Sequence, residues 1–152
     1  NWGFDNPEER EQWSHKDINQ VYRDYYQLLR ECAKTGMYDI MAHVDLVKKF
    51  GNFPTEDLTG EVKKTAQVFK ECGVAVEINT SGLRKPVKEM YPSLWNLKIY
   101  AAAGVPLTFG SDSHDPNDVG RDFDKAMILA REAGYSEYIL LKGREIERRV
   151  RF

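Results

Sequence analysis

The feature that most constrains this chain is its alternation of short apolar segments with longer amphipathic ones. Strand-like segments are predicted at residues 38–42, 74–79, 105–110 and 138–141. Helix-like segments are predicted to start at Asp17, at Thr55 or Thr59, at Ser93 and at Val119. Strands joined by helices of this length run parallel. The chain is therefore predicted to be an α/β protein, either an open doubly wound sheet or part of a closed barrel.

Length and composition fit one globular unit that spans residues 1–152. The chain has 41% hydrophobic and 30% charged residues, which is enough to bury a core, and its formal net charge is −2. This charge favours neither a nucleic acid nor a membrane partner, and no apolar run approaches the roughly 20 residues of a membrane span. Cys32 and Cys72 have no CxxC partner, which favours reduced thiols and a cytoplasmic location. The basic tail from Lys142 is predicted to be a solvated end.

The first predicted strand is followed by His43 and, two residues later, by Asp45. Sites in this architecture are built at the carboxyl ends of the strands, so both residues are candidates for chemistry. Each also has a structural interpretation. His43 can be a hydrogen-bonded structural histidine, and Asp45 can stabilise the turn that follows.

The third predicted strand leads into Ser111, Asp112, Ser113 and His114. If strand geometry continues to His114, the side chains of Asp112 and His114 point the same way, because strand side chains alternate with a period of two. A carboxylate and an imidazole on one side are suitable ligands for a divalent metal. The alternative is a polar turn.

The second predicted strand ends at Asn79 and is followed by a loop that contains Ser81 and Arg84. A guanidinium binds phosphate through two parallel hydrogen bonds, so Arg84 is the candidate anion contact. Lys85 and Lys88 are interpreted as solvated cations. The three strand ends together predict one site that combines a metal with a phosphate.

Three segments in combination resemble the PHP superfamily (polymerase and histidinol phosphatase), and most closely its histidinol-phosphate phosphatase branch. The segments are residues 39–51 (DIMAHVDLVKKFG), 77–86 (EINTSGLRKP) and 110–114 (GSDSH). Residues 2–5 (WGFD) also resemble the segment that follows one of the family's ligand histidines. The resemblance implies the C-terminal part of a distorted (β/α)7 TIM-like barrel, with parallel strands and crossover helices.

The same resemblance implies a site and a reaction. The family holds two or three divalent metal ions, for which zinc, manganese and iron are the candidates. The resemblance places metal ligands at His43, Asp112 and His114, phosphate contacts at Arg84 and Ser81, and supporting residues at Asp45 and Asn79. It implies hydrolysis of L-histidinol phosphate to L-histidinol and phosphate in histidine biosynthesis. Metal ions assist such reactions by lowering the pKa of bound water and neutralising phosphoryl oxygens.

The chain departs from the family pattern at its start. The early His-x-His motif, the second-motif histidine and the bridging glutamate are absent, and about 100 residues of a roughly 250-residue barrel are missing. We therefore expect a C-terminal portion that lacks the N-terminal strands and is inactive by itself. The alternatives are a PHP phosphoesterase for another phosphate ester, and a non-catalytic half-barrel that self-associates through its exposed barrel edge.

Overall fold

The structure is a computed structural model that describes residues 2–152. Its α-helices are α1 (Ile18–Lys34), α2 (Thr59–Cys72), α3 (Leu94–Ala103) and α4 (Phe123–Ala133). Its strands are β1 (Ile40–Met41), β2 (Ala75–Asn79), β3 (Leu107–Gly110), β4 (Glu137–Lys142) and β5 (Glu145–Arg151). Short 3₁₀ helices span Pro7–His15, Leu46–Phe50, Thr80–Arg84 and Pro116–Asp118. No helix within residues 2–152 has both the length and the apolar character needed to cross a bilayer.

Side-chain capping explains where α1 and α3 begin. The Asp17 carboxylate accepts hydrogen bonds from the backbone N–H groups of Asn19 (2.9 Å) and Gln20 (3.3 Å), so α1 starts where the sequence predicts. The Ser93 hydroxyl accepts from the Asn96 N–H in the same way at the start of α3. Of the two predicted starts of α2, Thr59 is the correct one.

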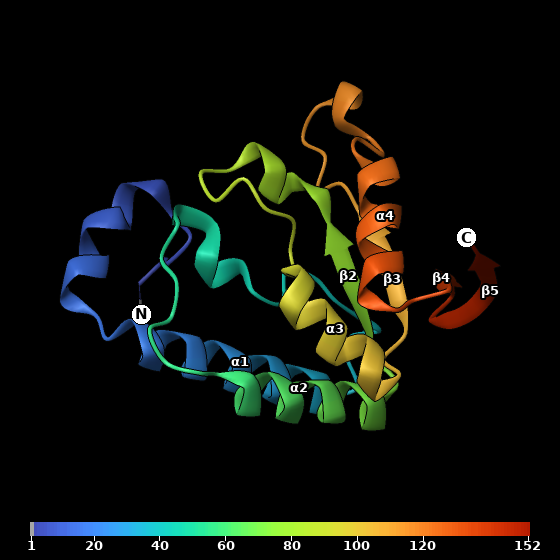
Figure 1. Cartoon of the computed structure of the whole chain (residues 1–152), viewed down its shortest axis with the longest axis horizontal. Helices are drawn as coiled ribbons and strands as arrows, with labels where there is room; N and C mark the ends of the chain where they lie inside the picture. Colours follow the sequence, from blue (N-terminus) through green and yellow to red (C-terminus); the bar gives the residue numbers. More distant parts are fainter. Residues whose placement is uncertain (1) are drawn as a thin grey trace.

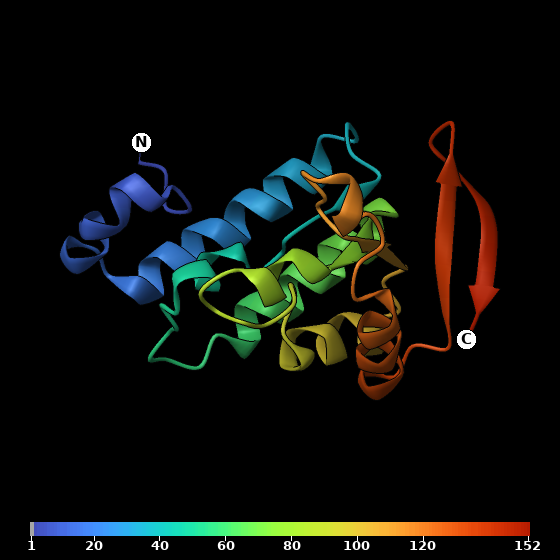
Figure 2. The same cartoon turned by 90° about the horizontal axis from the view of Figure 1, so that it is seen from above.

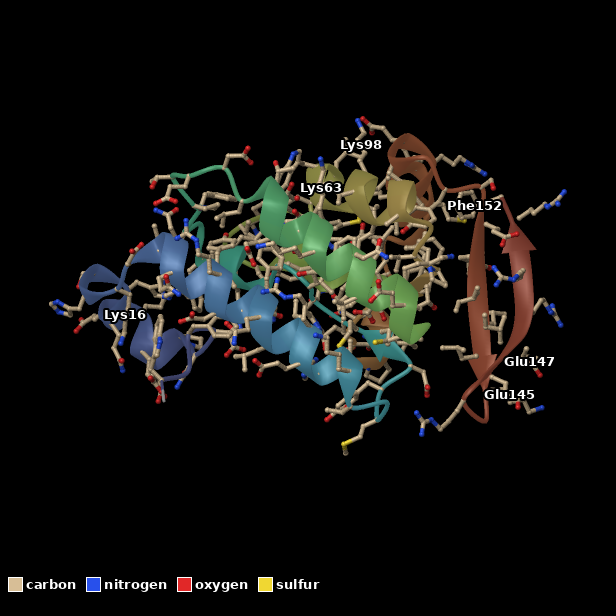
Figure 3. All side chains as sticks on the ribbon, turned by 90° about the horizontal axis from the view of Figure 1, so that it is seen from below. Lys16, Lys63, Lys98, Glu145, Glu147 and Phe152 are labelled. Atoms are coloured by element: carbon tan, nitrogen blue, oxygen red, sulfur yellow. The ribbon has the colours of Figure 1, made fainter. Side chains whose placement is uncertain are left out.

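The central sheet has three parallel strands in the order β1-β2-β3. The row of helices α1, α2, α3 and α4 packs so that each helix contacts the next (Figures 1 and 3). Figure 3 also shows the labelled Lys63 on α2 and Lys98 on α3 on this helical surface, away from the sheet. The core between the layers joins Val76 and Ile78 of β2 to helix residues such as Phe69 and Tyr100. The predicted α/β class and parallel sheet are confirmed.

The C-terminal hairpin corrects two predictions. Residues 138–141 do lie in a strand, but β4 pairs antiparallel with β5 instead of extending the parallel sheet. The tail that was expected to be a solvated end forms β5, although most of its side chains are exposed. Tertiary contacts explain the difference, because the ring of Phe152 stacks on Tyr138 and Tyr138 packs against Phe109 of β3. The hairpin and the first 3₁₀ helix lie at opposite ends of the molecule (Figures 1 and 2).

Two other boundaries differ from the predictions. Helix α4 begins at Phe123 and not at Val119, because the 3₁₀ turn Pro116–Asp118 and the left-handed backbone of Asp122 (φ 62°) precede it. Strand β1 has only two residues, Ile40 and Met41, whereas five were predicted. Both shifts shorten regular structure next to the carboxyl ends of β1 and β3, where the polar side chains lie.

Candidate functional site

Polar side chains gather at the carboxyl ends of the three parallel strands. His43 follows β1, Asn79 is the last residue of β2, and Asp112 follows β3. The pairing of Asn79 with Gly110 brings the ends of β2 and β3 to the same level. We call His43, Asn79, Ser81, Arg84 and Asp112 the strand-edge cluster.

His43 and Asp112 meet in this cluster. The Nε2 atom of His43 lies 3.5 Å from the Oδ2 atom of Asp112, and both side chains are only partly exposed. Both residues have left-handed backbones, with φ values of 53° and 47°. Residues other than glycine rarely adopt this conformation, and such strain concentrates at functional sites.

His114 lies at the margin of the cluster. Strand geometry stops at Gly110 and Asp112 is left-handed, so the expected alternation that would align Asp112 with His114 does not occur. The His114 side chain is 84% exposed, with its Nδ1 atom 3.0 Å from the backbone oxygen of Asp112 and 3.9 Å from the Oδ1 atom. The two oxygens of the Asp112 carboxylate therefore face different histidines.

The electrostatics of the cluster favour an ionised Asp112. Partial burial by itself would raise the pKa of the Asp112 carboxyl, but His43, the Ser81 hydroxyl and His114 lower it, and the net pKa lies below its ordinary value. An ionised carboxylate is the form that binds cations.

These donors fit a divalent metal in kind but not in number. Imidazole nitrogen and carboxylate oxygen suit zinc, iron and manganese alike. Within the part of the chain that the structure describes, however, no group of three or more histidine, cysteine, aspartate or glutamate side chains is arranged to hold a metal ion. A catalytic zinc usually has three protein ligands. The His43–Asp112 pair therefore offers two donors, fewer than a catalytic zinc usually takes.

Ser81 and Arg84 carry polar groups that lack partners among residues 2–152. The Ser81 hydroxyl is buried and has no partner there at good hydrogen-bond geometry, although it lies close enough to Asp112 to lower the pKa of that carboxyl. Nη1 of Arg84 is buried and has no partner there either. Another guanidinium nitrogen, Nη2, donates to the backbone oxygen of Ser111 (2.6 Å), and Nε lies 3.5 Å from a carboxylate oxygen of Asp118. Arg84 thus anchors the loop after β3 and keeps one donor available for an anion.

Asn79 is the member of the cluster with the most hydrogen-bond partners in it and beside it. Its side chain is buried, its Oδ1 atom accepts from the Ser81 N–H (2.9 Å), and its Nδ2 atom lies 3.0 Å from Nε2 of His43. Nδ2 also donates to the carboxylate of Glu77 (2.9 Å). The sequence reasoning did not single out Glu77, although a lone acid inside an otherwise apolar strand was a usable signal.

Asp45 belongs to a different cluster. Its Oδ2 atom accepts from Nζ of Lys48 (3.0 Å), the backbone N–H of Ser93 (2.7 Å) and Nδ2 of Asn96 (3.1 Å). Nζ of Lys48 also donates to Glu89 (2.6 Å). We call Asp45, Lys48, Glu89 and Asn96 the buried ion cluster. Burial raises the pKa of Asp45, and Lys48 opposes that rise.

Lys48 is a second residue that the sequence reasoning missed. It is 2% exposed, although lysine is almost never fully buried unless it is paired. The spacing of three residues from Asp45 to Lys48 was the available signal. The predicted role of Asp45 in stabilising the next turn takes another form, because its side chain bonds the start of α3 and makes no cap on the 3₁₀ helix Leu46–Phe50.

Individual known proteins match the chain, and those found are assigned as histidinol-phosphatases. No family model matches the chain. A Deinococcus radiodurans protein assigned as a histidinol-phosphatase is 38% identical over 133 residues, which cover 88% of this chain and 50% of that protein. The histidinol-phosphatase of Bacillus subtilis is 34% identical over 116 residues, which cover 70% of this chain and 43% of that protein. The chain thus spans about half the length of the curated relatives it matches.

A solved structure gives the same result. A crystal structure of a Listeria monocytogenes protein assigned as a histidinol phosphatase superposes with a TM-score of 0.63 at 25% sequence identity. The superposition covers 71% of this chain and 44% of the Listeria chain.

Proposed function

The chain is a homologue of the histidinol-phosphatases over about half of their length, and on this premise we propose that it supplies part of the active site of a metal-dependent phosphomonoesterase. The substrate we propose is L-histidinol phosphate, which is hydrolysed to L-histidinol and inorganic phosphate. The observation that carries the proposal is the strand-edge cluster. It combines an ionised carboxylate beside an imidazole with two buried donor groups that lack partners among residues 2–152.

Each residue of the cluster has a role in this proposal. His43 and Asp112, with His114 beside them, would hold a divalent ion such as zinc, manganese or iron. When bound, such an ion supplies positive charge to phosphoryl oxygens and lowers the pKa of a coordinated water. Nη1 of Arg84 and the Ser81 hydroxyl donate to the phosphate oxygens. Charge develops on these oxygens as the ester bond breaks, so a fixed guanidinium stabilises the transition state more than the ground state.

Phosphate release from L-histidinol phosphate tests the proposal. The purified chain, and any longer protein that contains this sequence, are assayed with Zn²⁺, Mn²⁺ or Fe²⁺ and again after chelation. We expect the longer protein to be active and to lose activity on chelation. We expect the chain alone to be inert or nearly so, because its ligand set is that of part of a site. Equal turnover by the chain alone would contradict the second expectation. A longer protein without phosphatase activity on any phosphate ester would refute the first.

One observation favours a second candidate function, in which the chain acts as an assembly module. Strand β1 is an edge of the three-stranded sheet, and its residue Ile40 is exposed, as are Met37 and Tyr38 just before it. Apolar residues at a sheet edge favour pairing with another polypeptide, and a second copy of the chain is the partner we propose for this function. Size-exclusion chromatography distinguishes the two candidates. A monomer at all concentrations would count against assembly, whereas a stable dimer without any bound metal would support it.

A further inference from the structure

Glu77 is a charged residue in the middle of an apolar central strand. It lies in β2, which is flanked by β1 and β3. Its carboxylate reaches along the sheet to Gly110, the last residue of β3. The Oε1 atom of Glu77 occupies the space that a Cβ atom on residue 110 would need. Glycine at position 110 therefore makes room for the Glu77 carboxylate.

The other carboxylate oxygen of Glu77 fixes the Asn79 amide. Nδ2 of Asn79 donates to Oε2 of Glu77 (2.9 Å), while Oδ1 accepts from the backbone N–H of Ser81 (2.9 Å). A backbone N–H can only donate and a carboxylate can only accept, so both contacts assign the same orientation to the amide. The second hydrogen on Nδ2 is then directed to Nε2 of His43, at 3.0 Å.

The His43 ring receives this contact on the nitrogen that faces Asp112. Nε2 accepts the hydrogen bond, so it carries the lone pair, and it lies 3.5 Å from Oδ2 of Asp112. The rest of His43 is held separately, because the Tyr25 hydroxyl donates to the His43 backbone oxygen (2.7 Å). The Asn79 amide is thus the contact that selects the tautomer and the direction of Nε2.

We propose that Glu77 is a positioning residue: its carboxylate, seated against Gly110, holds the Asn79 amide, and the amide directs Nε2 of His43 toward Asp112. The inference rests on the proposed function only for the assignment of His43 and Asp112 as metal-holding residues. The Asn79 hydrogen bond uses the Nε2 lone pair that an ion beside Asp112 would also need, so a bound ion has to displace the amide.

The first test uses NMR on the metal-free chain. In the unsubstituted chain we expect a cross-peak between the Asn79 side-chain amide protons and the His43 ring protons. We expect Glu77→Ala and Gly110→Ala to lose this cross-peak. Glu77→Gln, which keeps an acceptor oxygen, should retain it at lower intensity. Gly110→Ala keeps the Glu77 charge but displaces its carboxylate. Loss of the cross-peak in both Glu77→Ala and Gly110→Ala would therefore show that the position of the carboxylate matters, and not its charge alone. A cross-peak of full intensity in folded Glu77→Ala would overturn the proposal.

Matched controls separate this effect from general damage to the fold. Glu132→Ala removes an exposed carboxylate, and Gly60→Ala adds a methyl group where no atom lies within 4 Å. Both controls should keep the cross-peak. Urea unfolding of every variant confirms that it is folded, and the isosteric Glu77→Gln provides a readout if Gly110→Ala does not fold.

The second test measures Zn²⁺ affinity by competition with a chromophoric chelator. We expect Glu77→Ala to strengthen Zn²⁺ binding by up to about tenfold, because the ion no longer has to displace a firmly held amide from Nε2 of His43. In an Asn79→Ala background the same substitution should have no further effect, because Glu77 acts through Asn79. A change of the same size in that background would show that Glu77 acts on the ion directly and would overturn the proposal. If the chain binds no Zn²⁺ but shows the NMR changes, the metal part of the proposed function fails and the positioning role stands. If Zn²⁺ binds with equal affinity to the unsubstituted chain and to Glu77→Ala, and Glu77→Ala keeps its cross-peak, the positioning role fails and the metal part of the proposed function stands.

Discussion

His43 and Asp45 are two residues apart in the chain, yet their side chains enter clusters of different character. In the buried ion cluster, Asp45 and Lys48 are both 2% exposed and pair with each other. In the strand-edge cluster, His43 and Asp112 have strained backbones, and the groups without partners among residues 2–152 are the Arg84 and Ser81 donors. In the buried ion cluster the atoms without such partners are acceptors, Oδ1 of Asp45 and Oδ1 of Asn96.

The difference shows how two polar clusters in one molecule can serve stability and binding separately. A buried charge is tolerated when it is paired, as the charges of Asp45 and Lys48 are. Free donors at a partly open edge are a cost to the fold unless an anion uses them. We therefore expect substitutions in the buried ion cluster to change stability, and substitutions in the strand-edge cluster to change ligand binding.

The largest expected effect is that of Lys48→Met on stability. The substitution leaves the Asp45 carboxylate buried without its cation, which typically costs about 3–5 kcal/mol. Urea unfolding measures the loss. The double variant Asp45→Asn/Lys48→Met should be less destabilised than Lys48→Met alone, because neither charge is then left uncompensated. Lys64→Met, at an exposed pair with Glu61, is the matched control. A loss below about 1 kcal/mol for Lys48→Met would remove the contrast between the two clusters.

Arg84→Ala should produce the largest effect on binding. We expect the affinity of the chain for inorganic phosphate, measured by calorimetry, to fall at least about tenfold, since a hydrogen bond to a charged group contributes about 1.5–3 kcal/mol. Lys85→Ala, in the same loop, should have a smaller effect. Equal losses in the two variants would mean that the loop attracts phosphate by its total charge and that the Arg84 donor is not a specific contact.

Stability should depend on pH with opposite signs in the two clusters. The folded-state pKa of Asp112 is lowered, so its contribution to stability is present above its unfolded pKa, about 4, and is lost as the pH falls through the folded pKa. The folded-state pKa of Asp45 is raised, so its contribution is present below the unfolded pKa and is lost as the pH rises through the folded pKa.

Urea unfolding of Asp112→Asn and Asp45→Asn across this pH range tests these signs. The deficit of Asp112→Asn relative to the unsubstituted chain should shrink below about pH 4. The stability of Asp45→Asn relative to the unsubstituted chain should rise with pH above that point. If the free energy of unfolding changed with pH in the same way for both variants, the pKa values of Asp112 and Asp45 would not be shifted in opposite directions.

The smallest effect is expected for Glu89→Gln. Glu89 pairs with Lys48, but its side chain is 43% exposed, and exposed ion pairs contribute about 0–1 kcal/mol. Urea unfolding should therefore show a loss well below that of Lys48→Met. A loss of similar size would mean that Glu89, and not Asp45, is the main partner of Lys48.

The sequence predicted the α/β class and the parallel sheet, because both depend on local patterns. Apolar runs ended by polar residues located His43, Asn79 and Asp112 at three strand ends. The pattern failed for the C-terminal tail, which folds back on β4 across the tight turn at Gly143 and Arg144 and places Phe152 on Tyr138. It also failed for Lys48, whose burial depends on partners in distant segments of the chain.

By itself, the sequence determined the alternation of strands and helices, the capping at Asp17 and Ser93, and the kinds of donor available at the strand ends. The tertiary structure decided which of those donors meet. Beyond the end of a strand, side-chain direction follows the local φ angle and not the alternation of the strand. The left-handed backbones of His43 and Asp112 therefore set the geometry of the cluster. Asp45 lies in the buried ion cluster and Asn79 in the strand-edge cluster because of packing between elements far apart in the chain. The contact from Glu77 to His43 through Asn79 has the same origin.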